Sequence, residues 1–114
     1  MKFEAFEVSA DYDEYDNLII YFGADSHYLM IQYTDDPDEQ DIKSGMDTYY
    51  IERDDQGYSG YGGIKSWEIT NNSLHIHLDE KGTNHLKTDN IQITFSLERK
   101  KFDDLRTKLE KALN

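Results

Sequence analysis

The sequence has no cysteine, a single proline and half as many basic as acidic residues. Twelve Lys and Arg stand against 24 Asp and Glu, which gives a formal net charge of −12 over 114 residues. Without cysteine the chain cannot form disulfides or use a thiolate as a nucleophile or metal ligand. The negative charge disfavours nucleic acid and anionic membranes as direct partners, because both carry charge of the same sign. An acidic surface favours encounter with a basic protein instead.

Long apolar runs are also missing. The first residues, MKFEAFEV, contain acids where a signal peptide needs an apolar stretch, and no segment approaches the roughly 18 apolar residues of a transmembrane helix. We therefore expect a cytoplasmic protein. Nine Tyr, five Phe, one Trp and several Ile, Leu and Val clusters still provide enough apolar surface for one core. The length predicts a single domain over residues 1–114.

Alternating apolar residues predict a series of short strands. The first closes with Phe6 and Val8, and the others cover residues 17–23, 27–34, 48–53, 64–70, 73–78 and 90–97. The apolar run of residues 17–23 is continuous, so we expect that strand to be buried on both faces. Asn71 and Asn72 tolerate positive φ and predict a tight hairpin. The segments 10–17 and 35–47 are polar and are interpreted as loops.

From about Arg99 the apolar residues recur at helical spacing, with Phe102, Leu105, Leu109 and Ala112 on one side. Strands followed by a helix indicate the α+β class. We predict a mostly antiparallel sheet of six to seven strands with a C-terminal amphipathic helix packed on one face. This order of elements, strands followed by one helix, differs from the alternation of strands and helices in nucleotide-binding folds.

A glycine-rich stretch, GYSGYGGIKS, lies between two of the predicted strands. It resembles a phosphate-binding loop only superficially, because Ile64 occupies the place of the glycine before Lys65 and a strand pattern follows instead of a helix. We interpret the glycines as a turn or bulge that needs positive φ.

His75 and His77 alternate with apolar residues and are therefore predicted to project from one face of a strand. This pair supports an alternative function, in which the protein is a small metal-binding module or a metal-dependent enzyme that uses His75 and His77. The sequence signals no third ligand, whereas metal sites normally have three or four. Our main interpretation therefore includes no metal and no other cofactor.

Clusters of acids, DYDEYDN and DDPDEQD, offer oxygen ligands for weak divalent-ion binding. Neither has the central glycine and closing Glu of a helix-loop-helix calcium site. Ser59 lacks the strand-turn-helix setting of a nucleophilic serine. No set of catalytic residues is recognisable, so we do not expect an enzyme.

Tyrosine interleaved with carboxylates is the recurring feature of the chain, as in TYYIERDDQGYSGY. Tyr provides a large amphipathic contact with few rotatable bonds, which suits a protein interface, and acids add steering of a basic partner. Tyr on strands is equally common in cores, and one of Tyr49 and Tyr50 must point inward. The pattern therefore favours an interaction module, with a folded core as the competing explanation for part of it.

From about Tyr28 to its end, the sequence resembles the immunity protein 10 family of bacterial polymorphic-toxin systems. The most characteristic pieces are GMDTYYIE at residues 45–52, Gln56 and YGGI at residues 61–64, followed by LHIHLDEKG and IQITFSL. The resemblance implies a small cytoplasmic antitoxin that binds and blocks a cognate toxin domain. It implies no catalytic residues. The negative charge of the chain fits a basic toxin, such as a nuclease.

The resemblance and the Tyr/acid pattern together define candidate partner-binding residues. These are Asp35, Asp36, Asp38, Glu39, Asp41, Tyr49, Glu52, Asp54, Asp55, Gln56, Tyr58 and Tyr61. We expect the acids to raise the rate of association with a basic toxin and the exposed tyrosines to slow its dissociation.

Overall fold

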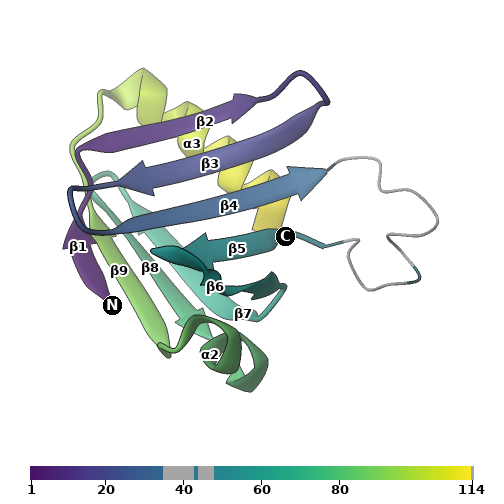
Figure 1. Cartoon of the computed structure of the whole chain (residues 1–114). Helices are drawn as coiled ribbons and strands as arrows, with labels where there is room; N and C mark the ends of the chain where they lie inside the picture. The colour runs from purple at the N-terminus through teal and green to yellow at the C-terminus, as the bar shows by residue number, and fades with distance from the viewer. Residues whose placement is uncertain (35–42, 44–47, 114) are drawn as a thin grey trace.

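The computed structural model describes residues 1–34, 43 and 48–113 (Figure 1). In this part of the chain, the strands are β1 (Lys2–Glu4), β2 (Glu7–Tyr12), β3 (Asn17–Gly23), β4 (Tyr28–Thr34), β5 (Tyr50–Arg53), β6 (Asp55–Tyr61), β7 (Ile64–Thr70), β8 (Ser73–Leu78) and β9 (Asn90–Thr94). The helices are α2 (Glu80–Leu86) and α3 (Arg99–Leu113). The predicted α+β class with a C-terminal helix is confirmed.

The strands form two sheets where the sequence predicted one. The five-stranded sheet has the order β2-β3-β4-β5-β6, and the four-stranded sheet has the order β1-β9-β8-β7. Neighbouring strands are antiparallel except for β1 and β9, which are parallel. The alternation of apolar residues indicates which face of each strand is buried, but it does not indicate which strands pair.

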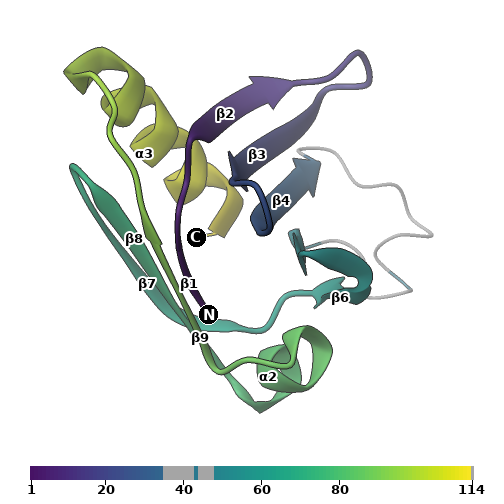
Figure 2. The same ribbon diagram turned by 60° about the vertical axis from the view of Figure 1, so that its left-hand side comes forward.

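The core lies between the two sheets, which Figure 2 shows facing one another with α3 between them at one end. The five-stranded sheet contributes Leu18, Ile20, Phe22, Leu29, Ile31 and Ile51, and the four-stranded sheet contributes Leu74, Ile76, Ile91 and Ile93, all nearly inaccessible. The apolar residues that alternate with His75 and His77 in β8 are thus in the core. Helix α3 buries Phe102, Leu105, Leu109 and Ala112, as its spacing predicted.

Three expectations about individual strands are wrong. Phe6, expected to close the first strand with Val8, lies between β1 and β2 and is 75% exposed. In β3, Leu18, Ile20 and Phe22 are buried, but Ile19 and Tyr21 are only partly buried, because they point away from the core to the other face of the sheet. The segment 10–17, interpreted as a loop, begins with the last three residues of β2, which pair with β3 as far as Tyr12 and Leu18.

The glycine-rich stretch is largely the edge strand β6, where the sequence predicted a turn. One turn precedes it, at Asp54 with φ 63°, and the predicted positive φ is found at Gly62 and Gly63, which connect β6 to β7. Gly60 is needed for packing against α2: a Cβ there would lie 2.0 Å from Nδ1 of His85. Helix α2 was not predicted, although Asp79 is a regular N-cap that accepts a hydrogen bond from the Gly82 N–H at 2.8 Å.

Candidate functional site

The outer face of the five-stranded sheet carries a hollow of about 340 Å³. We call it the tyrosine–glutamate hollow; its lining residues are Met30, Gln32, Thr34, Thr48, Tyr50, Glu52, Gln56 and Tyr61. Residues Met30 and Glu52 are direct partners across β4 and β5, as Tyr50 and Tyr61 are across β5 and β6. Since side chains alternate between the two faces of a strand, the core residue Ile51 points inward and its neighbours Tyr50 and Glu52 point into the hollow.

Glu52 is the charged residue among the described residues that line this hollow. Glu52 is 6% exposed, and it is the only buried charged residue among the described residues. The Tyr50 hydroxyl donates a hydrogen bond to Oε1 at 2.7 Å, and the Tyr28 hydroxyl donates one to Oε2. These donors stabilise the carboxylate without neutralising its charge, because a tyrosine hydroxyl carries none.

Both tyrosines remain protonated donors at neutral pH. Burial raises the pKa of Tyr28, and its hydrogen bond to Glu52 raises it further. Burial also raises the pKa of Tyr50, with Ser59 opposing the shift in part and Glu52 adding to it. Two aromatic contacts extend the surface: Tyr21 stacks on Tyr28 with centroids 6.0 Å apart, and Tyr61 meets Tyr50 edge-on at 5.4 Å. The carboxylate therefore sits among aromatic rings that are themselves fixed by neighbours.

Asp54, in the β5–β6 turn, is held by the protein itself. Its carboxylate accepts hydrogen bonds from the Tyr28 N–H at 2.9 Å and from Arg53 at 3.1 Å, and it lies 3.1 Å from Nδ1 of His27. Burial acts to raise the pKa of Asp54, but the hydrogen bonds from Tyr28, His27 and Arg53 together lower it. This carboxylate fixes the turn that positions β6.

The lowered pKa of Asp54 predicts a specific loss of stability in acid. A group whose pKa is lower in the folded than in the unfolded state stabilises the protein above its unfolded value, near 3.9 for Asp. That contribution disappears as the pH falls through the folded pKa. We expect Asp54→Asn to lower the free energy of unfolding by about 1 kcal/mol at pH 7, and we expect this effect to diminish as the pH falls below about 4. Urea denaturation across this pH range measures it.

Asn is the suitable replacement because it tolerates the positive φ of Asp54. Asp25→Asn, which changes an exposed acid of the β3–β4 turn, is the matched control. A constant difference in stability between Asp54→Asn and the unmodified protein at every pH would contradict the assignment.

The candidate residues from the sequence fall into three groups. Glu52, Gln56 and Tyr61 line the hollow, while Asp55 and Tyr58 are exposed on β6 beside it, with the Arg53 guanidinium 4.3 Å from the Tyr58 ring centroid. The side chain of Tyr49 is in the core, where its hydroxyl accepts a hydrogen bond from the Ile64 N–H, and Asp54 is engaged in the turn. Asp35, Asp36, Asp38, Glu39 and Asp41 lie outside the described residues.

Sequence reasoning missed part of the hollow. Met30 and Gln32 were seen only as strand residues, and Tyr28 was not connected with Glu52, 24 positions away. A usable signal was the alternation in residues 28–34: if Leu29 and Ile31 face the core, Tyr28, Met30 and Gln32 share the opposite face. The partner strand of that face could not be predicted in the same way.

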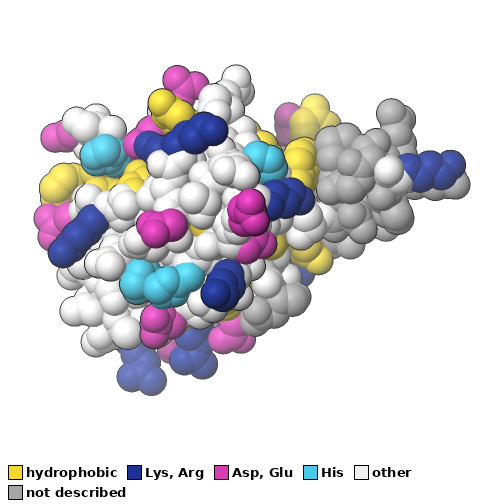
Figure 3. Space-filling model, turned by 90° about the horizontal axis from the view of Figure 1, so that it is seen from below, with side chains coloured by type: hydrophobic (Ala, Val, Ile, Leu, Met, Phe, Trp, Pro, Cys, Tyr) yellow, Lys and Arg dark blue, Asp and Glu magenta, His cyan; other side chains and the backbone are white. Residues whose placement is uncertain are grey.

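His75 and His77 project from one face of β8, as predicted, and lie outside the core on the four-stranded sheet. Glu68 of β7 joins them, so that three potential metal ligands lie together among the described residues. Figure 3 shows one face of the molecule on which acidic and basic side chains are interspersed and histidine side chains reach the surface.

No helix in the described part of the chain has the length and apolar character needed to cross a membrane.

Comparison with known proteins identifies the family. No curated protein and no solved structure in the comparisons matches the chain. The profile of the family described as immunity protein 10 matches residues 3–103, which includes both sheets and extends the similarity to the N-terminal strands. The chain therefore belongs to the immunity protein 10 family.

Proposed function

We propose that this protein binds a cognate bacterial toxin domain through the tyrosine–glutamate hollow and neutralises it by forming a stoichiometric complex. Membership of the immunity protein 10 family supports the immunity role. The observation that supports this particular surface is the buried carboxylate of Glu52 in the lining of a hollow that also contains Tyr50 and Tyr61. The protein needs no catalytic activity or cofactor for this function.

The chemistry of the hollow favours a cationic side chain as its occupant. A buried carboxylate is costly unless it is paired and hydrogen-bonded, and the two tyrosine hydroxyls supply hydrogen bonds but no positive charge. A Lys or Arg side chain of the toxin would supply that charge. Arg can also stack on an aromatic ring while it donates to the carboxylate, and Tyr50 and Tyr61 offer such rings.

The surroundings of the hollow suit an interface with a basic protein. Tyr58 and Tyr61 provide amphipathic contact area next to Asp55, and tyrosine is enriched among the residues that contribute most to binding. The net charge of −12 would steer a positively charged toxin towards the complex. A nuclease domain, whose active site attracts phosphate, is the toxin class that fits this charge best.

The test uses a toxin domain sought among the genes that neighbour the gene for this chain. We expect a 1:1 complex in light scattering coupled to size exclusion, and loss of toxin activity at one equivalent of the protein. Production of that toxin domain in the bacterial cytoplasm should stop growth unless the protein is produced with it. If toxin activity is unchanged by a molar excess of the folded protein, the proposal is wrong.

A further inference from the structure

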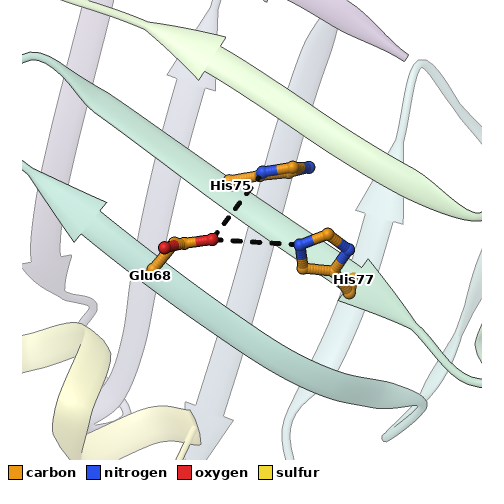
Figure 4. Close-up of side chains that lie close together, drawn as sticks. All are labelled: Glu68, His75 and His77. Atoms are coloured by element: carbon orange, nitrogen blue, oxygen red, sulfur yellow. Dashed lines mark ion pairs between the residues drawn. The ribbon is translucent and has the colours of Figure 1, made fainter.

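Three polar side chains converge on the outer face of the four-stranded sheet, away from the tyrosine–glutamate hollow. In Figure 4, Glu68 of β7 and both His75 and His77 of β8 point towards one another. Glu68 Oε1 lies 3.9 Å from His75 Nδ1 and 3.9 Å from His77 Nε2, and the two imidazole centroids are 4.1 Å apart. One donor atom from each residue lies within 4.8 Å of the others.

The β7–β8 hairpin explains this convergence. Thr70 pairs with Ser73 across the turn, and Glu68 is consequently the direct cross-strand partner of His75. His77 is two residues further along β8 and therefore on the same face. The arrangement follows from the strand register, so a well-packed part of the fold holds the three side chains together. Leu74, Ile76 and Leu78, on the opposite face of β8, anchor the strand in the core.

Two imidazole nitrogens and one carboxylate oxygen form a ligand set typical of zinc and related divalent transition metals. Zinc bonds of about 2.0–2.2 Å in tetrahedral geometry place ligand atoms about 3.4 Å apart. The two distances from Glu68 are slightly longer than this. The Glu68 side chain is 71% exposed, so its rotatable bonds are free to bring the carboxylate closer. Calcium and magnesium, which prefer all-oxygen sites, fit the imidazoles poorly.

A neighbouring strand adds a residue that orients one imidazole. Gln92 of β9 is the direct cross-strand partner of His75, and its amide Nε2 lies 3.4 Å from His75 Nε2. With the amide turned so that its oxygen faces the ring, His75 Nε2–H donates to that oxygen and Nδ1 keeps a lone pair directed at Glu68. Metal-binding histidines usually have such a partner for their second nitrogen.

We propose that Glu68, His75 and His77 bind one divalent transition-metal ion, with zinc as the representative ion. The protein supplies three ligands, and the partly exposed position leaves the fourth to water or to another ligand from solution. The ion would link β7 to β8 and so stabilise this hairpin. The site lies on the other sheet from the tyrosine–glutamate hollow and does not depend on toxin binding.

Zinc titration of the purified, tag-free protein tests the proposal after treatment with EDTA and removal of the chelator. Isothermal titration calorimetry with zinc chloride should give one site per chain. The double variant His75→Gln/His77→Gln should lose this site, and Glu68→Gln should bind zinc more weakly. Gln92→Ala keeps all three ligands and removes only the residue that orients His75. It should weaken zinc binding by about tenfold or more without abolishing it. His27→Gln, which changes an exposed histidine in the connection between β3 and β4, is the matched control and should bind as the unmodified protein does.

Cobalt(II) provides a second readout that depends on coordination geometry. Its visible absorption should show tetrahedral coordination in the unmodified protein and should lose that signature in the double variant. Circular dichroism in EDTA verifies that each variant is folded, and folding should persist because all three side chains point away from the core. Absence of one-site binding in the unmodified protein would overturn the proposal, as would zinc binding that the double variant retains.

Discussion

Glu52→Gln is expected to weaken toxin binding by about 2–5 kcal/mol, chiefly through faster dissociation. Gln has nearly the shape of Glu but no charge, so a Lys or Arg placed in the hollow by the toxin would lose its ionic partner while remaining desolvated. The residue is 6% exposed and is held by Tyr28 and Tyr50, which makes the site well ordered before binding. Surface plasmon resonance with the immobilised toxin domain measures both rates.

Glu110→Gln is the matched control for this experiment. It makes the same chemical change on the exposed side of α3, where Glu110 pairs with Arg106 at 3.4 Å, and it should leave affinity nearly unchanged. Thermal unfolding of both variants separates a binding defect from a folding defect. Equal toxin affinities for Glu52→Gln and the unmodified protein would show that the hollow does not receive a toxin cation, even if a complex forms elsewhere.

Leu105→Ala should lower the free energy of unfolding by about 2–5 kcal/mol. Leu105 is 2% exposed and belongs to the stripe of α3 that packs against the core, principally over β2, β3 and β4. Removing its side chain leaves a cavity that neighbouring residues fill only in part. Urea denaturation monitored by far-ultraviolet circular dichroism measures the change.

Lys100→Ala, on the exposed side of the same helix, controls for changes in helix propensity. It should alter the free energy of unfolding by less than about 0.5 kcal/mol, as surface substitutions usually do. If Leu105→Ala costs no more than Lys100→Ala, α3 does not pack on the sheets in solution as it does in the structure.

Local patterns in the sequence predicted the elements whose structure depends on near neighbours. The strand at 73–78 was predicted with its bounds and its two faces, because Leu74, Ile76 and Leu78 alternate with the two histidines. The helix from Arg99 was predicted from the spacing of Phe102, Leu105 and Leu109. The hairpin at Asn71 and Asn72 already implied that Glu68 faces His75. Glu68 is therefore the third potential ligand that the sequence analysis did not identify.

Features that depend on distant parts of the chain could not be predicted. Strand β6 contains Gly57 and Gly60, which disfavour a strand locally; it forms because β5 supplies backbone partners and α2 packs against Gly60. The burial of Glu52 likewise results from the approach of Tyr28 on a neighbouring strand. The sequence identified Glu52 as a candidate but offered no reason to set it apart from the exposed acids around it.

The parallel pairing of β1 with β9 has a consequence for how the protein is made. Lys2 pairs with Gln92, so β1 obtains its partner only after the whole chain between them, through β9, has been synthesised. Until then the edge of β1 that will bind β9 is unpaired, and the four-stranded sheet cannot close over the core. Contacts of such long sequence separation slow folding and bind distant segments into one cooperative unit. A product truncated before β9 would therefore retain every described residue that lines the tyrosine–glutamate hollow but would lack the closed four-stranded sheet that supports it.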